Sequence, residues 1–463
     1  MLRKYLLPKY LKLRWQDLFR ELESLRASQY FTRAELLHLQ EEKLHKLIRF
    51  VYENVPYYRA VFAERRLTPS DFRRIEDLPK LPILTKQQIK NDFPQLMPAT
   101  RKPPAFMRRT SGSTGSPYKV MIDESAALVE SALFYRFLFS IGYEWGDEII
   151  KLWGGPIVQP DNWAIAGNIK RRMSDAIWNH TMIDTYNLEA NMVSRLFSLL
   201  QRSNRKILRG YVSSVYAVAL EILRAGVAVQ VKALATTAER LFDYQRSAIE
   251  KAFQQKVYDQ YGCGESNSLA FECEAHNGLH LASEHVILEL VDNNGDPVSN
   301  DGMGRVLITD LDNYAMPLLR YQNDDLARWS PGACRCGRGS QRLHGIDGRV
   351  YEMLTVPGGK KIHGGFFDEI YIEMKFGDKY LIDDLRVVQE DLYNYRLEFV
   401  MRGSIDPRDV EALKQKYRQY LGDVNVKIHY VDSIAPTATG KRMFIIPQRQ
   451  ASDDNGWDNA HAL

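Results

Sequence analysis

The chain has little cysteine and no long apolar run, and both features exclude whole classes of protein. Only four of its 463 residues are cysteine, too few for a disulfide framework in a chain of this size. No stretch approaches the ~18 apolar residues of a membrane-spanning helix. The first residues are basic with scattered leucines, but charges and Pro8 interrupt them, so they lack the apolar centre of a secretory signal. These features predict a cytoplasmic protein without a membrane span.

The chain also lacks a large excess of positive or negative charge. The 62 basic and 58 acidic residues leave a formal net charge of +4, which does not by itself indicate a nucleic-acid-binding protein. Hydrophobic residues make up 45% of the chain and charged residues 26%, the composition of an ordinary globular protein. Because a single hydrophobic core stops growing near ~250–300 residues, the length predicts more than one domain.

Several catalytic motifs are absent too. The chain contains neither G-x-x-x-x-G-K-[ST] nor G-x-G-x-x-G, which excludes the usual P-loop and Rossmann signatures. It also contains neither H-E-x-x-H nor G-x-S-x-G, so the sequence gives no support for a zinc hydrolase or a serine hydrolase.

Apolar periodicity indicates how the chain is organised. From Trp15 to about Phe62, leucines recur at three- and four-residue steps and predict helices. Residues 78–94 contain three prolines, which favour an extended chain with a helix starting after Thr85. From about 106 to 330, strand-like apolar runs alternate with helical stretches, a pattern typical of α/β layers.

The chain after residue 348 carries its own strand and helix patterns. It is long enough for a small α+β domain. The last residues, from about 451, are polar, and we expect them to be frayed. We therefore expect an α/β fold with a multi-layer N-terminal region and a small C-terminal domain.

The segment Thr110-Ser-Gly-Ser-Thr-Gly-Ser-Pro117 is rich in glycine and hydroxyl residues. Glycine lets backbone N–H groups approach an anion closely, and hydroxyls add donors, so the segment suits a polyphosphate. A flexible loop has the same composition. Other motifs in the chain have to decide between the two.

Four further motifs follow in order. T-S-G-S-T-G-S-P resembles the phosphate-binding loop of the acyl- and aryl-adenylate-forming superfamily, and Tyr261-Gly-Cys-Gly-Glu265 resembles its Y-G-x-x-E. Arg320-Tyr-Gln-Asn-Asp-Asp-Leu326 is similar to its R-Y-R-T-G-D-L. Gly348-Arg349 resembles the start of its C-terminal domain, and Pro436-Thr-Ala-Thr-Gly-Lys441 its closing P-x-x-x-G-K. One such match is weak, but five in the family's order are specific.

Within that superfamily, the N-terminal stretches ENVPYYRAVF and LPKLPILTKQQIKNDFP resemble the phenylacetate–coenzyme A ligase group, including its CapK-type relatives. The resemblance implies the adenylate-forming fold. It also implies ATP-dependent activation of a carboxylic acid as an acyl-adenylate, release of pyrophosphate and transfer to a thiol, first of all coenzyme A. We expect a helical N-terminal segment over 1–105, a nucleotide- and substrate-binding core over 106–348, and a lid domain over 349–463 that rotates for the second half-reaction.

The resemblance also assigns residue roles. The residues expected to bind nucleotide are Thr110, Ser111, Gly112, Ser113, Thr114, Gly115, Tyr261, Gly262, Glu265, Asp325, Arg349 and Lys441. The loop would hold the β- and γ-phosphates, and Glu265 would help to hold Mg²⁺, a cation that prefers oxygen ligands. Tyr261 would pack on adenine, and Asp325 would accept from the ribose hydroxyls. Lys441, Glu265 and Arg349 are the expected catalytic residues, because charge gathers around the α-phosphate.

Plainer interpretations of single residues remain. Glu265 could be a solvated loop acid, Asp325 a helix cap and Lys441 a charge of the tail. The chain also departs from the family pattern. Asp324 replaces a glycine, Gln322-Asn323 replaces Arg-Thr, and Tyr351 stands where many relatives have a hinge acid. These departures put the geometry of the turn and the working of the hinge in doubt.

Three cysteines and a histidine form a second constellation. Cys273, His280, Cys334 and Cys336 make a Cys₃His set, which is typical of closed, structural Zn²⁺ sites. His276 competes as the nitrogen ligand, and unrelated thiols are an alternative. Some phenylacetate-ligase-like proteins carry a similar C…GLH…C-x-C arrangement, which favours zinc.

The substrate acid and the acceptor are not readable from the sequence. Aromatic residues between about 130 and 265 suggest an aromatic acid, although they could equally belong to the core. The acyl group could instead go to a carrier protein, an amine or a sugar, or the chain could be a scaffold without turnover. A homodimer is suggested by analogy alone.

Overall fold

The computed structural model describes residues 15–100, 102–110, 118–153, 175, 177–184, 196–197, 199–200, 206–239, 241, 243–292, 294–298, 302–346, 353–359, 361–363, 382–401, 404–432 and 445–446. Within these ranges, none of the helices combines the length and the apolar character that crossing a bilayer would need.

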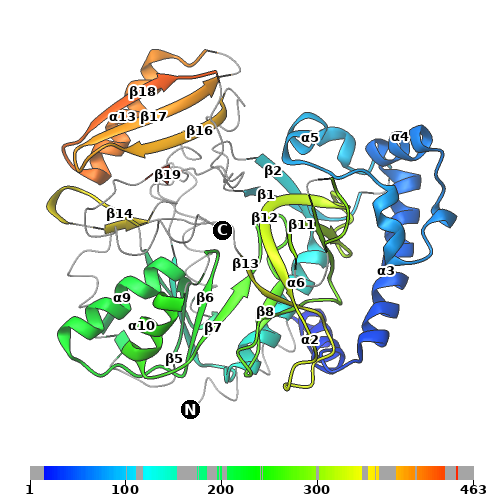
Figure 1. The fold of residues 1–463 in the computed structure, drawn as a ribbon, viewed down its shortest axis with the longest axis horizontal. Helices are drawn as coiled ribbons and strands as arrows, with labels where there is room; N and C mark the ends of the chain where they lie inside the picture. The colour runs from blue at the N-terminus through cyan, green and yellow to red at the C-terminus, as the bar shows by residue number, and fades with distance from the viewer. Residues whose placement is uncertain are drawn as a thin grey trace.

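Three α-helices open the described chain, where the leucine spacing predicts them: α2 (Gln16–Ser28), α3 (Arg33–Asn54) and α4 (Pro56–Arg65). A capping box starts α3, since Thr32 accepts from the backbone N–H of Glu35 and the Glu35 carboxylate accepts from Thr32. In Figure 1, α3 and α4 form the right-hand edge of the molecule.

A connecting segment of short helices follows α4. It contains η1 (Pro69–Asp71), η2 (Ile75–Lys80), α5 (Lys86–Asn91) and η3 (Phe93–Leu96). The start of α5 directly after Thr85 confirms the sequence prediction, and a capping box with Gln88 explains it. The buried side chains of this segment and of α3 share one core with those of β2 (Tyr118–Asp123), which pairs with β1 (Ala105–Thr110) as a hairpin.

Eleven strands form one mixed sheet in the order β10-β11-β12-β13-β9-β8-β7-β6-β5-β3-β4. Strands β3 to β7 run parallel, and the remaining neighbours are antiparallel. The bounds are β3 (Glu148–Trp153), β4 (His180–Asp184), β5 (Lys206–Tyr211), β6 (Ala233–Thr237), β7 (Val257–Tyr261), β8 (Ala270–Glu272), β9 (Leu279–Leu281), β10 (Val286–Val291), β11 (Met303–Asp310), β12 (Tyr321–Ser330) and β13 (Arg342–Ile346).

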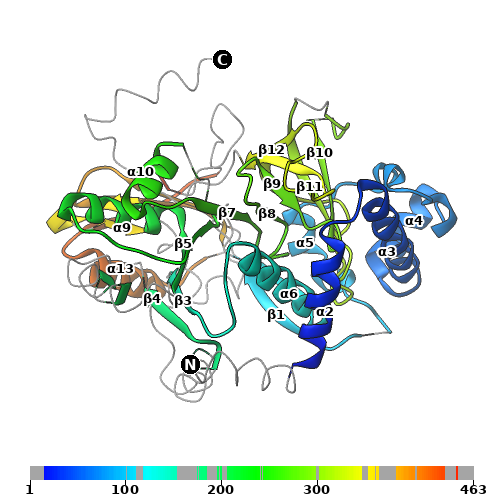
Figure 2. The same cartoon turned by 90° about the horizontal axis from the view of Figure 1, so that it is seen from below.

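Helices cover both faces of the parallel half of the sheet. Alternate residues of a strand face opposite sides: Ile149 packs against α2 and α6 (Glu124–Ser140), whereas Ile150 packs against α9 (Val212–Ala225) and α10 (Asp243–Phe253). Figure 1 shows α9 and α10 beside β5 to β7, and Figure 2 shows α2 along α6. Burial on both faces explains why apolar residues occupy successive positions in these strands, as in Ile149-Ile150 and Ile207-Leu208.

The last part of the chain forms a second, smaller sheet. Its order is β18-β17-β16-β19, and it has a core of its own with α13 that includes Tyr395, Phe399 and Tyr417. The elements are β14 (Met353–Thr355), η4 (Pro357–Gly359), β15 (Lys361–His363), β16 (Ile382–Gln389), β17 (Asn394–Met401), α13 (Pro407–Leu421), β18 (Asn425–Tyr430) and β19 (Ile445–Ile446). A large mixed α/β sheet with a small C-terminal sheet confirms the predicted fold class. The boundary at 348/349 falls outside the described residues and stays a prediction.

Candidate active site

Two of the sequence motifs meet at the end of β7. Tyr261 is the last residue of β7, and Asp325 lies on β12. The Tyr261 hydroxyl donates to Asp325 Oδ2 at 2.7 Å. Asn323 holds both groups, since its Nδ2 lies 2.7 Å from the Tyr261 oxygen and 2.6 Å from Asp325 Oδ2. The fold therefore joins two segments that are far apart in the sequence.

Strand β12 also holds Glu265 in place. The Tyr321 hydroxyl donates to Glu265 Oε1 at 2.6 Å, and both side chains are buried. Tyr321, Asn323 and Asp325 are alternate residues of β12, so they lie on one face of the strand. That face aligns the carboxylates of Glu265 and Asp325.

Gly262 has a packing role in this turn. A Cβ atom at this position would lie 2.0 Å from the carbonyl oxygen of Asn267. Any other residue would push the two backbones apart and displace the segment that carries Glu265.

The departure at Asp324 turns out to be accommodated. Asp324 adopts φ +67°, the left-handed conformation that a glycine would adopt without cost and that aspartate tolerates better than most residues. Lys86 of α5 lies 2.8 Å from the Asp324 carboxylate and donates to the carbonyl oxygen of Asn323 at 3.0 Å. The backbone of the turn is thus kept without the glycine, because charge and hydrogen bonds hold it.

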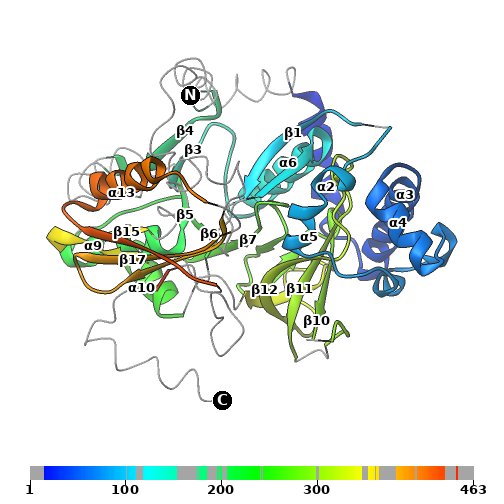
Figure 3. The same cartoon turned by 90° about the horizontal axis from the view of Figure 1, so that it is seen from above.

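The predicted phosphate loop lies in the sequence between the two strands of the β1–β2 hairpin. Strand β1 ends at Thr110 and β2 begins at Tyr118, and these two residues pair in register. The Arg108 guanidinium of β1 donates to Glu130 and, at 3.3 Å, to the carbonyl oxygen of Gly264. The hairpin therefore lies next to the residue that precedes Glu265. Figure 3 shows the hairpin beside α6.

The other predicted site residues lie outside the described part of the chain. They are Ser111, Gly112, Ser113, Thr114, Gly115, Arg349 and Lys441, and Tyr351 lies outside it as well. Their roles stay predictions.

A cavity of about 1040 Å³ lies beside the joined motifs. Tyr261, Gly262 and Asp325 line it, as do Lys151 of β3 and Arg209 of β5. In doubly wound sheets, ligands bind at the carboxyl ends of the parallel strands, and the cavity reaches these ends at Tyr211, Thr237 and Tyr261. Of the aromatic residues in α6, Phe134 reaches the cavity, whereas Tyr135 and Phe137 pack in the core.

The Cys₃His residues form a cluster at the opposite end of these strands. Cys273 follows β8, His280 lies in β9, and Cys334 and Cys336 lie in the loop between β12 and β13. One ligand atom from each lies within 4.8 Å of all the others. Sγ of Cys273 is 3.7 Å from Sγ of Cys334, and Sγ of Cys336 is 3.3 Å from Nε2 of His280.

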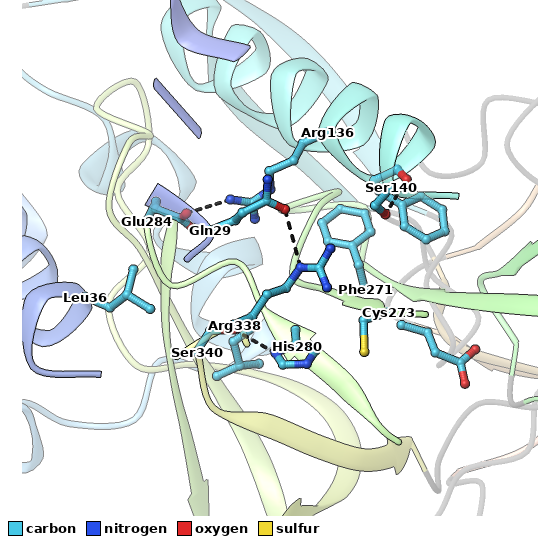
Figure 4. A pocket seen from close by; sticks show the side chains of 13 residues that line it. Gln29, Leu36, Arg136, Ser140, Phe271, Cys273, His280, Glu284, Arg338 and Ser340 are labelled. Atoms are coloured by element: carbon cyan, nitrogen blue, oxygen red, sulfur yellow. Dashed lines mark hydrogen bonds and ion pairs between the residues drawn. The ribbon is translucent and has the colours of Figure 1, made fainter. Parts of the chain in front are cut away.

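These distances fit a tetrahedral metal. With Zn–S bonds of ~2.3 Å, two thiolate sulfurs around zinc lie ~3.8 Å apart, whereas a disulfide would bring them to ~2.05 Å. Ser340 lies 3.1 Å from Nδ1 of His280, which leaves Nε2 facing the sulfurs. Figure 4 shows this contact and Cys273 opposite the histidine. His276 instead turns toward Glu272, at 3.4 Å, so the geometry favours His280 as the nitrogen ligand.

A buried histidine joins the Glu265 segment to the helical N-terminal segment. His285 lies 3.0 Å from the hydroxyl of Ser266 and 2.8 Å from Asp312. Lys43 of α3 lies 2.8 Å from the same aspartate. The order Ser–His–Asp is that of a nucleophilic triad, but Ser266 is not among the described residues that line the cavity. The group serves to position the segment.

The charge of His285 gives a pH-dependent prediction. Burial alone would lower its pKa, but Asp310 and Asp312 raise it to about 9. A raised pKa stabilises the fold fully below ~6.5, the pKa of an unfolded histidine, and this stabilisation is lost as the pH rises through about 9. We expect His285→Gln to lower the free energy of unfolding by roughly 3 kcal/mol at pH 6.

The measurement is denaturant unfolding of parent and variant from pH 6 to 10, where the difference should shrink toward the alkaline end. His38→Gln, an exposed residue of α3, is the matched control and should change little. A difference that stays constant across this range would contradict the assigned charge.

Sequence reasoning missed Tyr321, Asn323 and Arg108. Period-two spacing from Asp325 could have found the first two, because alternate strand residues share a face. Nothing in the sequence relates Arg108 to Gly264, since that contact depends on the packing of the hairpin on the sheet.

The chain matches no family model, but it is similar to several phenylacetate-coenzyme A ligases. Phenylacetate-coenzyme A ligase of Thermus thermophilus is 29% identical over 346 residues, 73% of this chain and 74% of that protein. The ligase of the same name from Aromatoleum evansii is 25% identical over 431 residues, 90% and 95% of the two chains. Protein CapK of Staphylococcus aureus is 21% identical over 425 residues, 89% of each chain.

Solved structures show the same fold. The structure of 2-hydroxyisobutyryl-CoA ligase in complex with 2-HIB-AMP and CoA superposes with a TM-score of 0.60 at 21% identity, covering 91% of this chain and 92% of that one. A second structure of that ligase, in the postadenylation state with R3-HIB-AMP, gives a TM-score of 0.58. The likeness extends over nearly the whole chain.

Proposed function

Because the chain belongs to the phenylacetate–coenzyme A ligase and CapK-like family of adenylate-forming enzymes, we propose that it joins a carboxylic acid to AMP, with release of pyrophosphate, and then passes the acyl group to a thiol. Coenzyme A is the first acceptor to test, because the relatives from Thermus thermophilus and Aromatoleum evansii are named phenylacetate-coenzyme A ligases. An aromatic acid remains the proposed substrate class, supported by the names of these relatives and by Phe134 in the cavity.

The observation that supports this function most is that strand β12 brings Tyr261, Glu265 and Asp325 together, beside a cavity that reaches the carboxyl ends of the parallel strands. An acid is a poor electrophile, and linking it to AMP supplies a leaving group. The enzyme must therefore hold nucleotide and acid next to each other.

The residues present fit ATP and Mg²⁺. Asp325 offers a carboxylate for the ribose hydroxyls, and Glu265 offers an oxygen ligand of the kind that Mg²⁺ prefers. When bound, Mg²⁺ neutralises part of the phosphate charge. Tyr321 orients the Glu265 carboxylate, and Asn323 orients that of Asp325.

We further propose that residues 349–463 act as the lid and bring Lys441 to the nucleotide. The separate hydrophobic core of the small sheet supports a unit that can move as one body. Arg349 would stand at its start and meet phosphate or ribose.

We propose that the Cys₃His cluster holds structural Zn²⁺. All four ligand positions are filled by side chains, so no position is left for a substrate. The ion would fasten the β8–β9 turn to the β12–β13 loop.

Exchange of labelled pyrophosphate into ATP, measured across aryl, fatty and dicarboxylic acids, tests the shared first step. Exchange with any of these acids supports adenylation. If ATP binds but no acid supports exchange, the chain is better interpreted as a scaffold without turnover than as an enzyme.

One relative, protein CapK, is not named as a coenzyme A ligase, and the second candidate is therefore transfer of the acyl group to an amine, a sugar or a carrier protein. Both enzymes would begin with the same adenylate. Product analysis with coenzyme A, amine, sugar and carrier-protein acceptors separates them.

Replacing Glu265 by Gln should weaken the dependence on Mg²⁺. The variant keeps an oxygen but loses the charge, so the apparent Mg²⁺ affinity in the exchange reaction should fall by about tenfold to 100-fold. In Tyr321→Phe, Glu265 keeps its charge and loses only the orienting hydrogen bond, so the apparent Mg²⁺ affinity should fall less. Equal Mg²⁺ titrations of parent and Glu265→Gln would remove Glu265 from the metal site.

A further inference from the structure

The β1–β2 hairpin forms a sheet of its own, separate from the eleven-stranded sheet. Among the described strands, backbone pairing therefore does not join it to β7, and side chains have to place it. At the end away from the predicted phosphate loop, Asn313 does so. Its side chain accepts from the backbone N–H of Asp123 at 3.1 Å and donates to the carbonyl oxygen of Met121 at 3.0 Å. At the end next to the loop, the link is Arg108, close to the end of β1.

The Arg108 guanidinium and the Glu130 carboxylate of α6 form a two-point ion pair. Nη1 of Arg108 lies 3.1 Å from Oε1 of Glu130, and Nη2 lies 2.7 Å from Oε2, a forked geometry that fixes direction as well as distance. The Glu130 side chain is 6% exposed and that of Arg108 is 18% exposed. Burying two charges has a desolvation cost, and apolar residues can stabilise such a place equally well. Overall stability therefore does not explain why charges lie here.

Glu130 also holds the turn that carries Glu265. Its Oε1 accepts from the backbone N–H of Asn267 at 2.8 Å, and its Oε2 accepts from the side-chain amide of Asn267 at 3.2 Å. Each carboxylate oxygen thus accepts one hydrogen bond from the hairpin and one from the turn. Arg108 reaches the same turn directly, since it donates to the carbonyl oxygen of Gly264 at 3.3 Å.

The two elements joined in this way are those expected to hold the triphosphate. The hairpin carries the predicted phosphate loop between its strands, and the turn carries Glu265, the proposed Mg²⁺ ligand. Because Mg²⁺ bridges phosphate oxygens, the loop and the metal ligand must keep a fixed spacing. Tyr261 and Asp325, expected to bind adenine and ribose, are held by Asn323 of β12 instead. The Arg108–Glu130 pair therefore acts on the triphosphate end of the nucleotide.

We propose that Arg108 and Glu130 are positioning residues that set the spacing between the phosphate loop and Glu265, so that Mg²⁺ and the β- and γ-phosphates are bound together. This inference rests on the proposed function. It adds two residues that lie outside all five family motifs. They act through the loop and through Glu265 rather than on the reacting atoms.

The test compares a nucleotide that has β- and γ-phosphates with one that lacks them. Calorimetric binding of MgATP and of AMP is measured for the parent, Arg108→Met and Glu130→Gln. The MgATP affinity of both variants should fall by about tenfold to 100-fold, the range found when a residue that orients a metal ligand is replaced, while the AMP affinity stays close to the parental value. In pyrophosphate exchange, the KM for MgATP should rise and the KM for the acid should stay unchanged.

Arg136→Met is the matched control, because it breaks another buried ion pair of α6. Arg136 lies 2.6 Å from Glu284 and donates to the carbonyl oxygen of Leu25, and neither partner belongs to the hairpin or to the Glu265 turn. This variant should lower the melting temperature without changing the ratio of the two affinities. The double variant Arg108→Met/Glu130→Gln leaves no charge unpaired, so it supplies the same comparison if Arg108→Met alone does not fold.

The outcomes distinguish this inference from the proposed function. Folded variants that bind MgATP like the parent, or that lose MgATP and AMP affinity in equal measure, overturn the inference and leave adenylation standing. A selective loss of MgATP affinity in Arg136→Met also overturns it, because any buried ion pair of α6 would then have the same effect. A parent that binds neither nucleotide overturns the proposed function, and the inference falls with it.

Discussion

Replacing Lys441 by Ala is expected to reduce pyrophosphate exchange by about 100- to 1,000-fold, the range found when one preorganised donor to a developing charge is removed. Negative charge grows on the α-phosphate as the carboxylate attacks. The family resemblance gives Lys441 the task of bridging substrate carboxylate and α-phosphate, and a compact ammonium serves this as a point charge. The loss should appear mainly in the turnover number, because the contact strengthens in the transition state.

The design separates the two half-reactions. When the variant is given a preformed acyl-adenylate and coenzyme A, it should form the thioester at a rate close to that of the parent, because the α-phosphate is already linked. Lys427→Ala is the matched control, since Lys427 is an exposed lysine on β18. Exchange by Lys441→Ala at the parental rate would remove the assigned role, and with it the argument for the lid.

Removal of one ligand of the Cys₃His cluster is expected to have the largest effect on stability. The cluster joins the turn after β8 to the loop before β13, and three of its four residues are buried. Without the metal, the thiols and the imidazole lose the ligand bonds that hold these loops together. We expect Cys336→Ser to lower the free energy of unfolding by about 4 kcal/mol, as loss of a structural metal can, and the melting temperature by roughly 10 °C.

Metal analysis and calorimetry measure the two effects on the same samples. The purified parent should contain one zinc per chain, and Cys336→Ser should contain much less. Cys263→Ser is the control, because Cys263 is a buried thiol outside the cluster and should leave the zinc content unchanged. A parent purified without chelator that holds almost no metal would end the zinc proposal.

Much of the fold was predictable from local patterns. Leucine periodicity predicted α2 and α3, and the Thr85 cap predicted the start of α5, because both signals depend on neighbours within a few residues. The comparisons confirm the family resemblance that five motifs in order had indicated. The short motifs themselves could be read because each needs its residues in one continuous stretch.

The contacts between the motifs were not predictable. Asp324 departs from the family pattern, and only the structure shows Lys86, from a distant helix, holding its left-handed backbone. Sequence alone did not show whether His276 or His280 is the nitrogen ligand of the cluster. The answer depends on which of them faces the cysteines of the β12–β13 loop, more than fifty residues away. Aromatic content suggested an aromatic pocket, yet most rings of α6 pack in the core, and five lysine and arginine residues line the cavity.

Local patterns were enough to predict the layers, the family and the residue types available for chemistry, because periodicity and motifs are local properties of the chain. Which of these residues share a site depends on the packing of distant segments. Lys151 and Arg209 become neighbours through the strand order of the sheet, and Glu265 receives its orientation from Tyr321 on another strand. Contacts of this kind depend on how distant strands pair and pack, which short-range patterns do not encode.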